Sequence, residues 1–278
     1  MHHFTASDGA RIAYEDEGSG RPLVMLHGLM AHGGFFENQR VLAGDFRLIR
    51  IDLRGHGGSP EGGRTATVEQ LAEDVAALAK GLDLRGAIGV GWSLGAAVLW
   101  RMLTGPEASR FAAAVIVDMT PRVLNADGWD LGLTGEACDL RTAAIRDDFP
   151  TFAVNAGRAI FAPPVADRTR KTADWAGSEF ARNDPTAIGS VWSSLVDQDF
   201  RADLPRIEQP TLVIHGAHSQ LYGPGTADHL VRALPNARAV RFERSGHAPH
   251  MEEPELFNRL IGEFAAGLPR TREAHATA

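Results

Sequence analysis

A serine set between two glycines constrains this chain more than any other feature. Ser93 stands at the centre of Gly91-Trp92-Ser93-Leu94-Gly95, after the short apolar run 88–90 and before an apolar segment with several small residues. This order predicts a buried strand, a sharp turn and a helix. The close approach of backbones at such a turn favours residues without a Cβ on both sides of the serine. The serine hydroxyl is then presented at a helix N-terminus, which is the position of a nucleophile.

Strand and helix patterns alternate along most of the chain. Apolar runs bounded by turn-forming residues predict strands at 10–16, 22–26, 46–51, 88–90, 111–117, 211–216 and 238–242. Helical patterns predict helices at 34–43, 68–82, 226–234 and 254–267, together with the helix after Ser93. Such alternation is typical of an α/β fold with a mostly parallel sheet and helices on both faces. The loosely alternating segment 10–16, which precedes a Gly-Ser-Gly turn, is expected at the edge of that sheet.

The pattern changes between residues 121 and 205, where no clear strand is visible. We interpret this segment as an inserted, mainly helical cap, with residues 1–120 and 206–278 forming the core domain. Most aromatic residues of the segment are expected to pack inside the cap, and a few to line an apolar pocket. The candidates for such a pocket are Met30, Trp92, Trp129 and Trp192.

Composition excludes several classes of protein. The chain has 278 residues and a formal net charge of −7, without a basic cluster, which argues against nucleic acid or an anionic membrane as the main partner. Cys138 is the only cysteine, so an intramolecular disulfide and a cysteine zinc site are excluded, and the scattered histidines suggest no metal site. The N-terminus lacks the pattern of a secretory signal, and no apolar run is long enough for a membrane helix. We therefore expect a cytoplasmic protein with a small-molecule substrate and no cofactor.

A second loop is expected to meet the Ser93 turn. The apolar strand 22–26 ends in His27-Gly28-Leu29-Met30. If this loop lies beside Ser93, the Leu29 amide can point at the same place as the Leu94 amide. Two such donors would form an oxyanion hole.

A serine nucleophile also requires a base, because its hydroxyl is weakly reactive at neutral pH. Of the eleven histidines, His247 lies in a glycine-rich loop after the last predicted strand, and His250 is its nearest rival. Hydrogen bonding to the local backbone is the expected role of three histidines in turn motifs: His27, His56 and His215.

Four motifs, in this order and spacing, carry a resemblance that spans residues 10–267. They are His27-Gly28, Asp52-Leu53-Arg54-Gly55-His56-Gly57-Gly58-Ser59, Gly91-Trp92-Ser93-Leu94-Gly95 and Ser245-Gly246-His247. The chain resembles the α/β-hydrolase fold superfamily in its serine hydrolase branch. That resemblance implies an eight-stranded, mostly parallel sheet with a helical cap after the sixth strand. It also implies that Ser93 is the nucleophile, His247 its base, and Leu29 and Leu94 the backbone oxyanion donors.

The third catalytic residue departs from the commonest pattern of that superfamily. Most members carry an aspartate a few residues after the strand equivalent to 211–216, but residues 217–225 hold no carboxylate and Ser219 stands in its place. Some branches instead place the acid at the end of the strand that follows the nucleophile helix, as one type of haloalkane dehalogenase and the fungal zearalenone lactonases do with a glutamate. Asp118 ends that strand here, and we predict it as the orienting acid; the alternative is that Asp118 is only a turn residue.

The expected reaction is acyl transfer to water through a Ser93 acyl-enzyme, with an ester, a lactone or a thioester as substrate. Two alternatives remain open. The cofactor-free dioxygenases of heteroaromatic quinolones resemble the same fold and use a His/Asp dyad, although they usually carry a histidine next to the serine where this chain has Trp92. The other alternative is a non-catalytic ligand-binding protein of this fold, which the missing carboxylate near Ser219 would favour.

Overall fold

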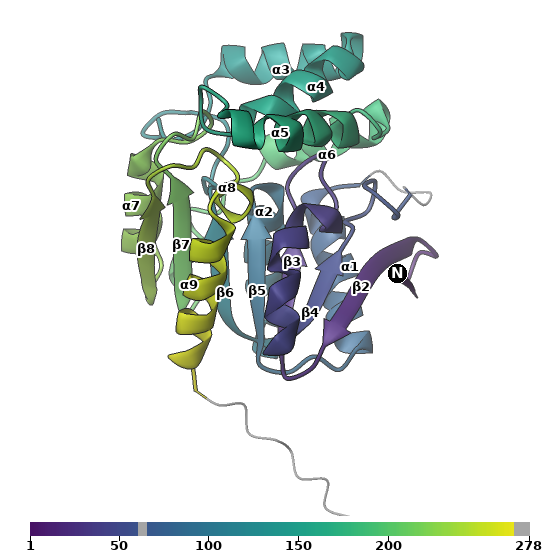
Figure 1. The fold of residues 1–278 in the computed structure, drawn as a ribbon, viewed down its shortest axis with the longest axis vertical. Helices are drawn as coiled ribbons and strands as arrows, with labels where there is room; N and C mark the ends of the chain where they lie inside the picture. Colours follow the sequence, from purple (N-terminus) through teal and green to yellow (C-terminus); the bar gives the residue numbers. More distant parts are fainter. Residues whose placement is uncertain (61–65, 270–278) are drawn as a thin grey trace, which may run out of the picture.

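The computed structural model describes residues 1–60 and 66–269, without the side chains of residues 167 and 168. Within these ranges eight strands form one sheet in the order β1-β2-β4-β3-β5-β6-β7-β8 (Figure 1). The strands are β1 (His2–Thr5), β2 (Arg11–Gly18), β3 (Arg21–Leu26), β4 (Phe46–Ile51), β5 (Ala87–Trp92), β6 (Phe111–Val117), β7 (Thr211–Gly216) and β8 (Ala237–Phe242). The pairings of β1 with β2 and of β2 with β4 are antiparallel, and the others are parallel. The predicted α/β class with a mostly parallel sheet is confirmed.

The centre of the sheet is buried on both faces, as its apolar strands require. Every residue of β5 is buried, and Val24 of β3 lies between Ile49 of β4 and Gly89 of β5. Parallel strands covered by helices on both sides read as continuous apolar runs rather than as alternating ones. This is why the central strands β3, β4 and β5 could be recognised from the sequence.

The prediction that segment 10–16 forms the edge of the sheet is wrong. This segment lies within β2, and β1 pairs antiparallel with it on the outer side, with His3 opposite Ala13. A strand of four residues is too short to show a period of two, so β1 carried no recognisable sequence signal.

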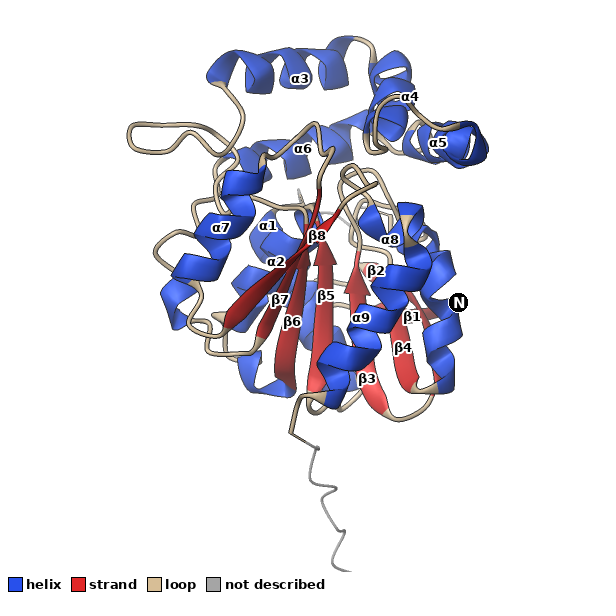
Figure 2. Cartoon of the chain, turned by 60° about the vertical axis from the view of Figure 1, so that its left-hand side comes forward, coloured by secondary structure: helices blue, strands red, loops and turns tan. Residues whose placement is uncertain are grey.

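Helices cover both faces of the sheet (Figure 2). One face carries α1 (Val68–Gly81), α2 (Leu94–Leu103) and α7 (Pro224–Ala233), and the other carries the 3-10 segment η1 (Gly33–Gly44), α8 (Pro249–Glu252) and α9 (Pro254–Ala266). Thr67 caps the α1 helix, since its Oγ1 accepts a hydrogen bond from the Gln70 amide at 3.2 Å. The helix expected at 34–43 forms as η1, with a kink at Phe36. Two further 3-10 turns are η2 (Ala108–Arg110) and η3 (Leu204–Arg206).

Between β6 and β7 the chain forms a helical layer over the carboxyl ends of the strands (Figures 1 and 2). Its helices are α3 (Gly135–Asp147), α4 (Phe149–Ala159), α5 (Asp167–Phe180) and α6 (Pro185–Val196). The α4 and α5 helices approach so closely at Gly157 and Gly177 that a Cβ on Gly157 would lie 2.3 Å from the Gly177 amide nitrogen. We interpret this layer as the cap, and loops at the carboxyl ends of β3, β5, β6 and β8 lie beneath it. No helix in the described part of the chain is long and apolar enough to cross a membrane.

Candidate active site

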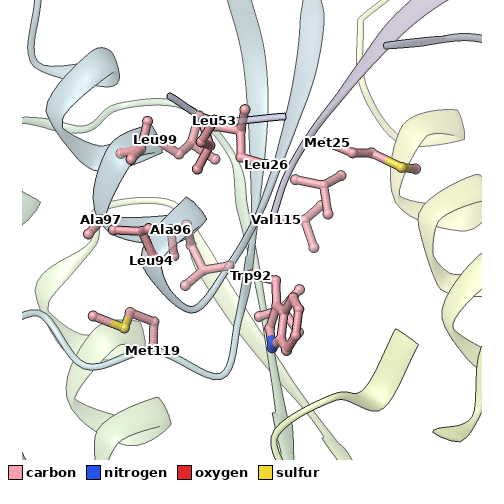
Figure 3. Close-up of a cluster of buried hydrophobic side chains, with 14 of the residues drawn as sticks. Met25, Leu26, Leu53, Trp92, Leu94, Ala96, Ala97, Leu99, Val115 and Met119 are labelled. Carbon is pink, nitrogen blue, oxygen red and sulfur yellow. The ribbon is translucent and has the colours of Figure 1, made fainter. Parts of the chain in front are cut away.

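Ser93 occupies a strained turn between β5 and α2. Its φ is 53° and its ψ is −119°, a region that residues with side chains rarely adopt. A Cβ on Gly91 would lie 2.5 Å from the carbonyl oxygen of Gly95, and one on Gly95 would lie 2.1 Å from that of Leu26. Both glycines are therefore required by the close approach of the β3 and β5 backbones to the start of α2. The apolar side chains that support this turn include Leu26, Trp92, Leu94, Ala96 and Met119 (Figure 3).

The loop after β3 lies directly against Ser93. A Cβ on Gly28 would come within 3.3 Å of the Ser93 Cβ, so the following residue, Leu29, is carried next to the serine. Met30 has a φ of 67°, and its carbonyl accepts a hydrogen bond from Asn183 Nδ2 of the cap at 2.7 Å. On the other side, Leu94 is the first residue of α2, and the first amides of a helix have no intrahelical acceptor. The two predicted oxyanion donors thus lie on two loops that meet at the serine.

Asp118, directly after β6, and His247, in the loop after β8, form a buried pair. His247 Nδ1 lies 2.6 Å from Asp118 Oδ2, and the two residues are 2% and 3% exposed. Asp118 directly follows β6, and the Ser93 amide donates to the carbonyl of Val117 at 3.0 Å, so acid and serine start from adjacent positions of the sheet. A carboxylate on Nδ1 selects the tautomer that carries its proton there, and this leaves Nε2 as a base.

Ser219 is the second side chain that contacts the Asp118 carboxylate. Its hydroxyl lies 2.6 Å from Asp118 Oδ2, while its oxygen accepts from the amides of Leu221 at 3.3 Å and Tyr222 at 3.4 Å. Because those amides occupy the hydroxyl oxygen, the hydroxyl proton points to the carboxylate. Ser219 therefore donates a hydrogen bond to the carboxylate that His247 also contacts.

Hydrogen bonds hold the His247 loop to Trp92, the residue before Ser93, and to the cap. Trp92 Nε1 donates to the His247 carbonyl at 2.7 Å. Glu252 accepts from the Gly246 amide at 2.6 Å and from the Ala162 amide, between α4 and α5, at 2.9 Å. These bonds fix the backbone of the His247 loop to Trp92 and to the cap.

His250, the rival of His247, lies in a different environment. It is fully buried, and its ring packs against Phe36, Trp92 and Phe257 at centroid distances of 4.9, 4.8 and 5.9 Å. Burial lowers the pKa of His250 to about 3, with a smaller contribution from His247. The neutral His250 ring, packed among aromatic residues, acts as part of the core, whereas the His247 ring contacts the Asp118 carboxylate.

The four pocket candidates have different positions. Met30 lies on the loop beside Ser93, and Trp92 lies behind the serine, 1% exposed. Trp192, on α6, donates from Nε1 to Thr142 Oγ1 at 2.9 Å. Trp129 packs on the flank of the molecule, because its ring meets His229 of α7 at a centroid distance of 4.8 Å and its Nε1 donates to the Arg122 carbonyl.

Two side chains near the pair were not predicted. The Tyr222 ring lies 6.1 Å from that of His247, and burial raises the pKa of its hydroxyl. Arg141 of α3 lies over the Trp192 ring, with Cζ 5.0 Å from its centroid. No periodicity or motif marks either residue, since only packing between the cap and the core places them. Among the described residues no group of three or more potential metal ligands comes together.

Comparisons with known proteins agree with this architecture. Residues 23–260 match the α/β hydrolase family. The chain is 32% identical to a pimeloyl-[acyl-carrier protein] methyl ester esterase of Nitrosomonas europaea, covering 89% of this chain and 97% of that protein. It is also 32% identical to a non-heme chloroperoxidase of Streptomyces lividans, covering 93% and 97% of the two chains. The structure of an esterase from Exiguobacterium antarcticum is similar, with a TM-score of 0.90, 26% identity and coverage of 95% and 99%. By its fold, its motifs and these matches, the chain belongs to the α/β hydrolase superfamily.

Proposed function

We propose that this protein hydrolyses a carboxylic ester, lactone or thioester through an acyl-enzyme on Ser93. The observation that carries the proposal is the buried His247–Asp118 pair at 2.6 Å, whose carboxylate directly follows the strand next to that of the glycine-flanked serine. A carboxylate-held imidazole and a half-buried serine on a strained turn match the requirements of nucleophilic catalysis.

In this mechanism His247 Nε2 removes the Ser93 hydroxyl proton as the serine oxygen attacks the substrate carbonyl. The negative charge of the tetrahedral intermediate is stabilised by the Leu29 and Leu94 amides. The imidazolium, stabilised by Asp118, then protonates the leaving alcohol or thiol, and the acyl group remains on Ser93. Water enters, gives its proton to His247 and attacks the acyl-enzyme, which releases the acid and restores the serine.

The relatives support this reaction class. Two similar proteins are named esterases, one of them a methyl ester esterase, and both match over nearly their whole lengths. The cap lies over the candidate site and is connected to it through Asn183 and Glu252. A covered site of this kind excludes bulk water and favours a small organic substrate over a polymer.

Labelling with a fluorophosphonate, followed by intact-mass measurement, tests the proposal. We expect one rapid addition to the wild-type protein and none to Ser93→Ala, because the reagent reacts with a serine only when a base and an oxyanion hole activate it. Absence of labelling in folded wild-type protein would contradict the proposal. Oxygen consumption with a hydroxyquinolone would then favour the dioxygenase alternative, and ligand binding without turnover would favour the binding-protein alternative.

Replacing Ser219 by alanine should lower kcat about tenfold and leave KM nearly unchanged. The variant loses a hydrogen bond to a charged group, worth ~1.5–3 kcal/mol, part of which holds Asp118 in its catalytic orientation. Ser219→Thr keeps the hydroxyl and should recover most of the rate. Steady-state kinetics with a p-nitrophenyl ester measure both effects, and equal rates for Ser219→Ala and wild type would exclude this positioning role.

The peroxidase-named relative gives a second candidate activity for the same site. Hydrogen peroxide could replace water in the second step, so that the acyl-enzyme releases a peroxy acid. Bromination of monochlorodimedone in the presence of hydrogen peroxide, acetate and bromide measures this reaction, because the peroxy acid oxidises bromide to the brominating species. It should disappear in Ser93→Ala if the acyl-enzyme is the intermediate.

A further inference from the structure

Arg141 is a cation without an anionic partner among the described residues. Its guanidinium lies over the Trp192 ring at 5.0 Å, and no carboxylate among the described side chains lies within ion-pair distance of it. Arg146, five residues later on the same helix, instead pairs with Asp147 at 2.7 Å and is largely exposed. Arginine side chains away from water are normally paired, because an unpaired buried charge is costly.

Arg141 is half-buried rather than free on the outer surface. Burial lowers the pKa of its guanidinium, yet the side chain is only partly shielded from solvent contact. The groups with a smaller influence on this pKa are Tyr222 and Cys138, both buried.

Tyr222 connects this cation to the catalytic pair. The Arg141 charge lowers the pKa of the Tyr222 hydroxyl while the Asp118 charge raises it, so Tyr222 is within electrostatic reach of both groups. Its ring also contacts that of His247 at 6.1 Å. Tyr222 therefore lies near both the Arg141 cation on α3 and the His247–Asp118 pair.

Trp192 gives the guanidinium a fixed orientation. Its Nε1 donates to Thr142 Oγ1, and the Thr142 hydroxyl donates to the Cys138 carbonyl at 2.9 Å, which anchors the ring to α3. A guanidinium stacked on a rigid ring keeps its edge N–H groups free, and these donors match the two oxygens of a carboxylate.

We propose that Arg141, stacked on Trp192, binds a carboxylate carried by the substrate, so that the preferred substrate is an ester, lactone or thioester with a free carboxylate at a distance from the scissile bond. This inference rests on the proposed hydrolase function and specifies its substrate class. It assigns Arg141 to substrate binding, without a part in the proton transfers.

Matched ester pairs test the proposal. The first pair is p-nitrophenyl hydrogen glutarate and p-nitrophenyl glutaramate, which differ only by a carboxylate against a neutral amide. The second pair, 4-butyryloxybenzoate and 4-butyryloxybenzamide, places the same difference on the alcohol side. We expect wild-type protein to prefer the anionic member of at least one pair by about 30-fold in kcat/KM, mainly through KM.

Variants on α3 separate the binding role from a structural one. Arg141→Gln should remove the preference, because it lowers kcat/KM for the anionic ester far more than for its neutral partner, and Arg141→Lys should keep part of it. Arg146→Gln, on the same helix, should retain the full preference. The proposal would be overturned if wild type had the same kcat/KM for both members of each pair. It would also be overturned if Arg141→Gln kept the preference for the anionic ester.

A binding measurement separates this inference from the hydrolase proposal. Calorimetric titration of glutarate into Ser93→Ala, with and without Arg141→Gln, reports carboxylate binding without turnover. Binding that requires Arg141 in a protein that cleaves no ester and takes no fluorophosphonate would reject the hydrolase function and keep the carboxylate site. Ester cleavage without any dependence on Arg141, in rates or in glutarate binding, would reject the site and keep the hydrolase.

Discussion

Replacing Asp118 by asparagine should lower kcat about 10³–10⁴-fold with little change in KM, as expected when the acid of a serine triad is neutralised. The amide preserves the shape of the side chain, but it cannot stabilise the imidazolium of His247, which the wild-type carboxylate contacts at 2.6 Å. It can also donate to Nδ1, which favours the tautomer with its proton on Nε2, where it blocks the base. Initial rates on a p-nitrophenyl ester, with active-site titration of each preparation, measure the effect.

A second substitution shows whether the acid acts through its charge. In the Asp118→Asn background, Ser219→Asp places a carboxylate beside the position of Asp118 Oδ2, since the Ser219 hydroxyl lies 2.6 Å from it. We expect the double variant to regain at least tenfold in kcat over Asp118→Asn. A rate for Asp118→Asn within threefold of wild type would show that Asp118 is only a turn residue.

The parts of the fold that follow from local rules were predictable. Buried parallel strands read as apolar runs, and the contacts of Gly91 and Gly95 show why the serine turn has a sequence signature at all. The contact of Asp118 with His247 could be expected for a similar reason, because an apolar run ended at Asp118 and residues 217–225 held no carboxylate. Its φ of 46° adds backbone strain at the end of β6, a feature that Ser93 and Met30 share.

Contacts between distant segments could not be predicted. The stacking of Arg141 on Trp192 joins α3 to α6, and the contact of Tyr222 with His247 joins the loops after β7 and β8. Helical periodicity does not specify which face of a cap helix meets the core when several faces carry apolar residues. For the same reason Trp129, a pocket candidate by its residue type, lies instead against α7.

The motif that contains Arg54 contributes stability rather than chemistry. The Arg54 guanidinium is fully buried; its Nε and Nη2 donate to Asp74 at 2.8 and 2.7 Å, and its Nη1 donates to Asp8 at 2.7 Å. Arg54→Met should lower the free energy of unfolding by ~3–5 kcal/mol, because it leaves the Asp74 carboxylate buried without its partner. Urea unfolding followed by circular dichroism measures this loss.

The control is Arg85→Met, which breaks a pair with Asp83 whose side chains are 72% and 66% exposed and should change the unfolding free energy by less than ~1 kcal/mol. The pH dependence gives an independent check, since Arg54 lowers the pKa of Asp8 from 3.8 to about 2. A lowered carboxyl pKa means that the Asp8 contribution is present above about pH 4 and disappears as the pH falls through 2. The stability difference between wild type and Arg54→Met should therefore shrink over that interval. If Arg54→Met and Arg85→Met unfold at the same urea concentration, the buried pair contributes no more than an exposed one.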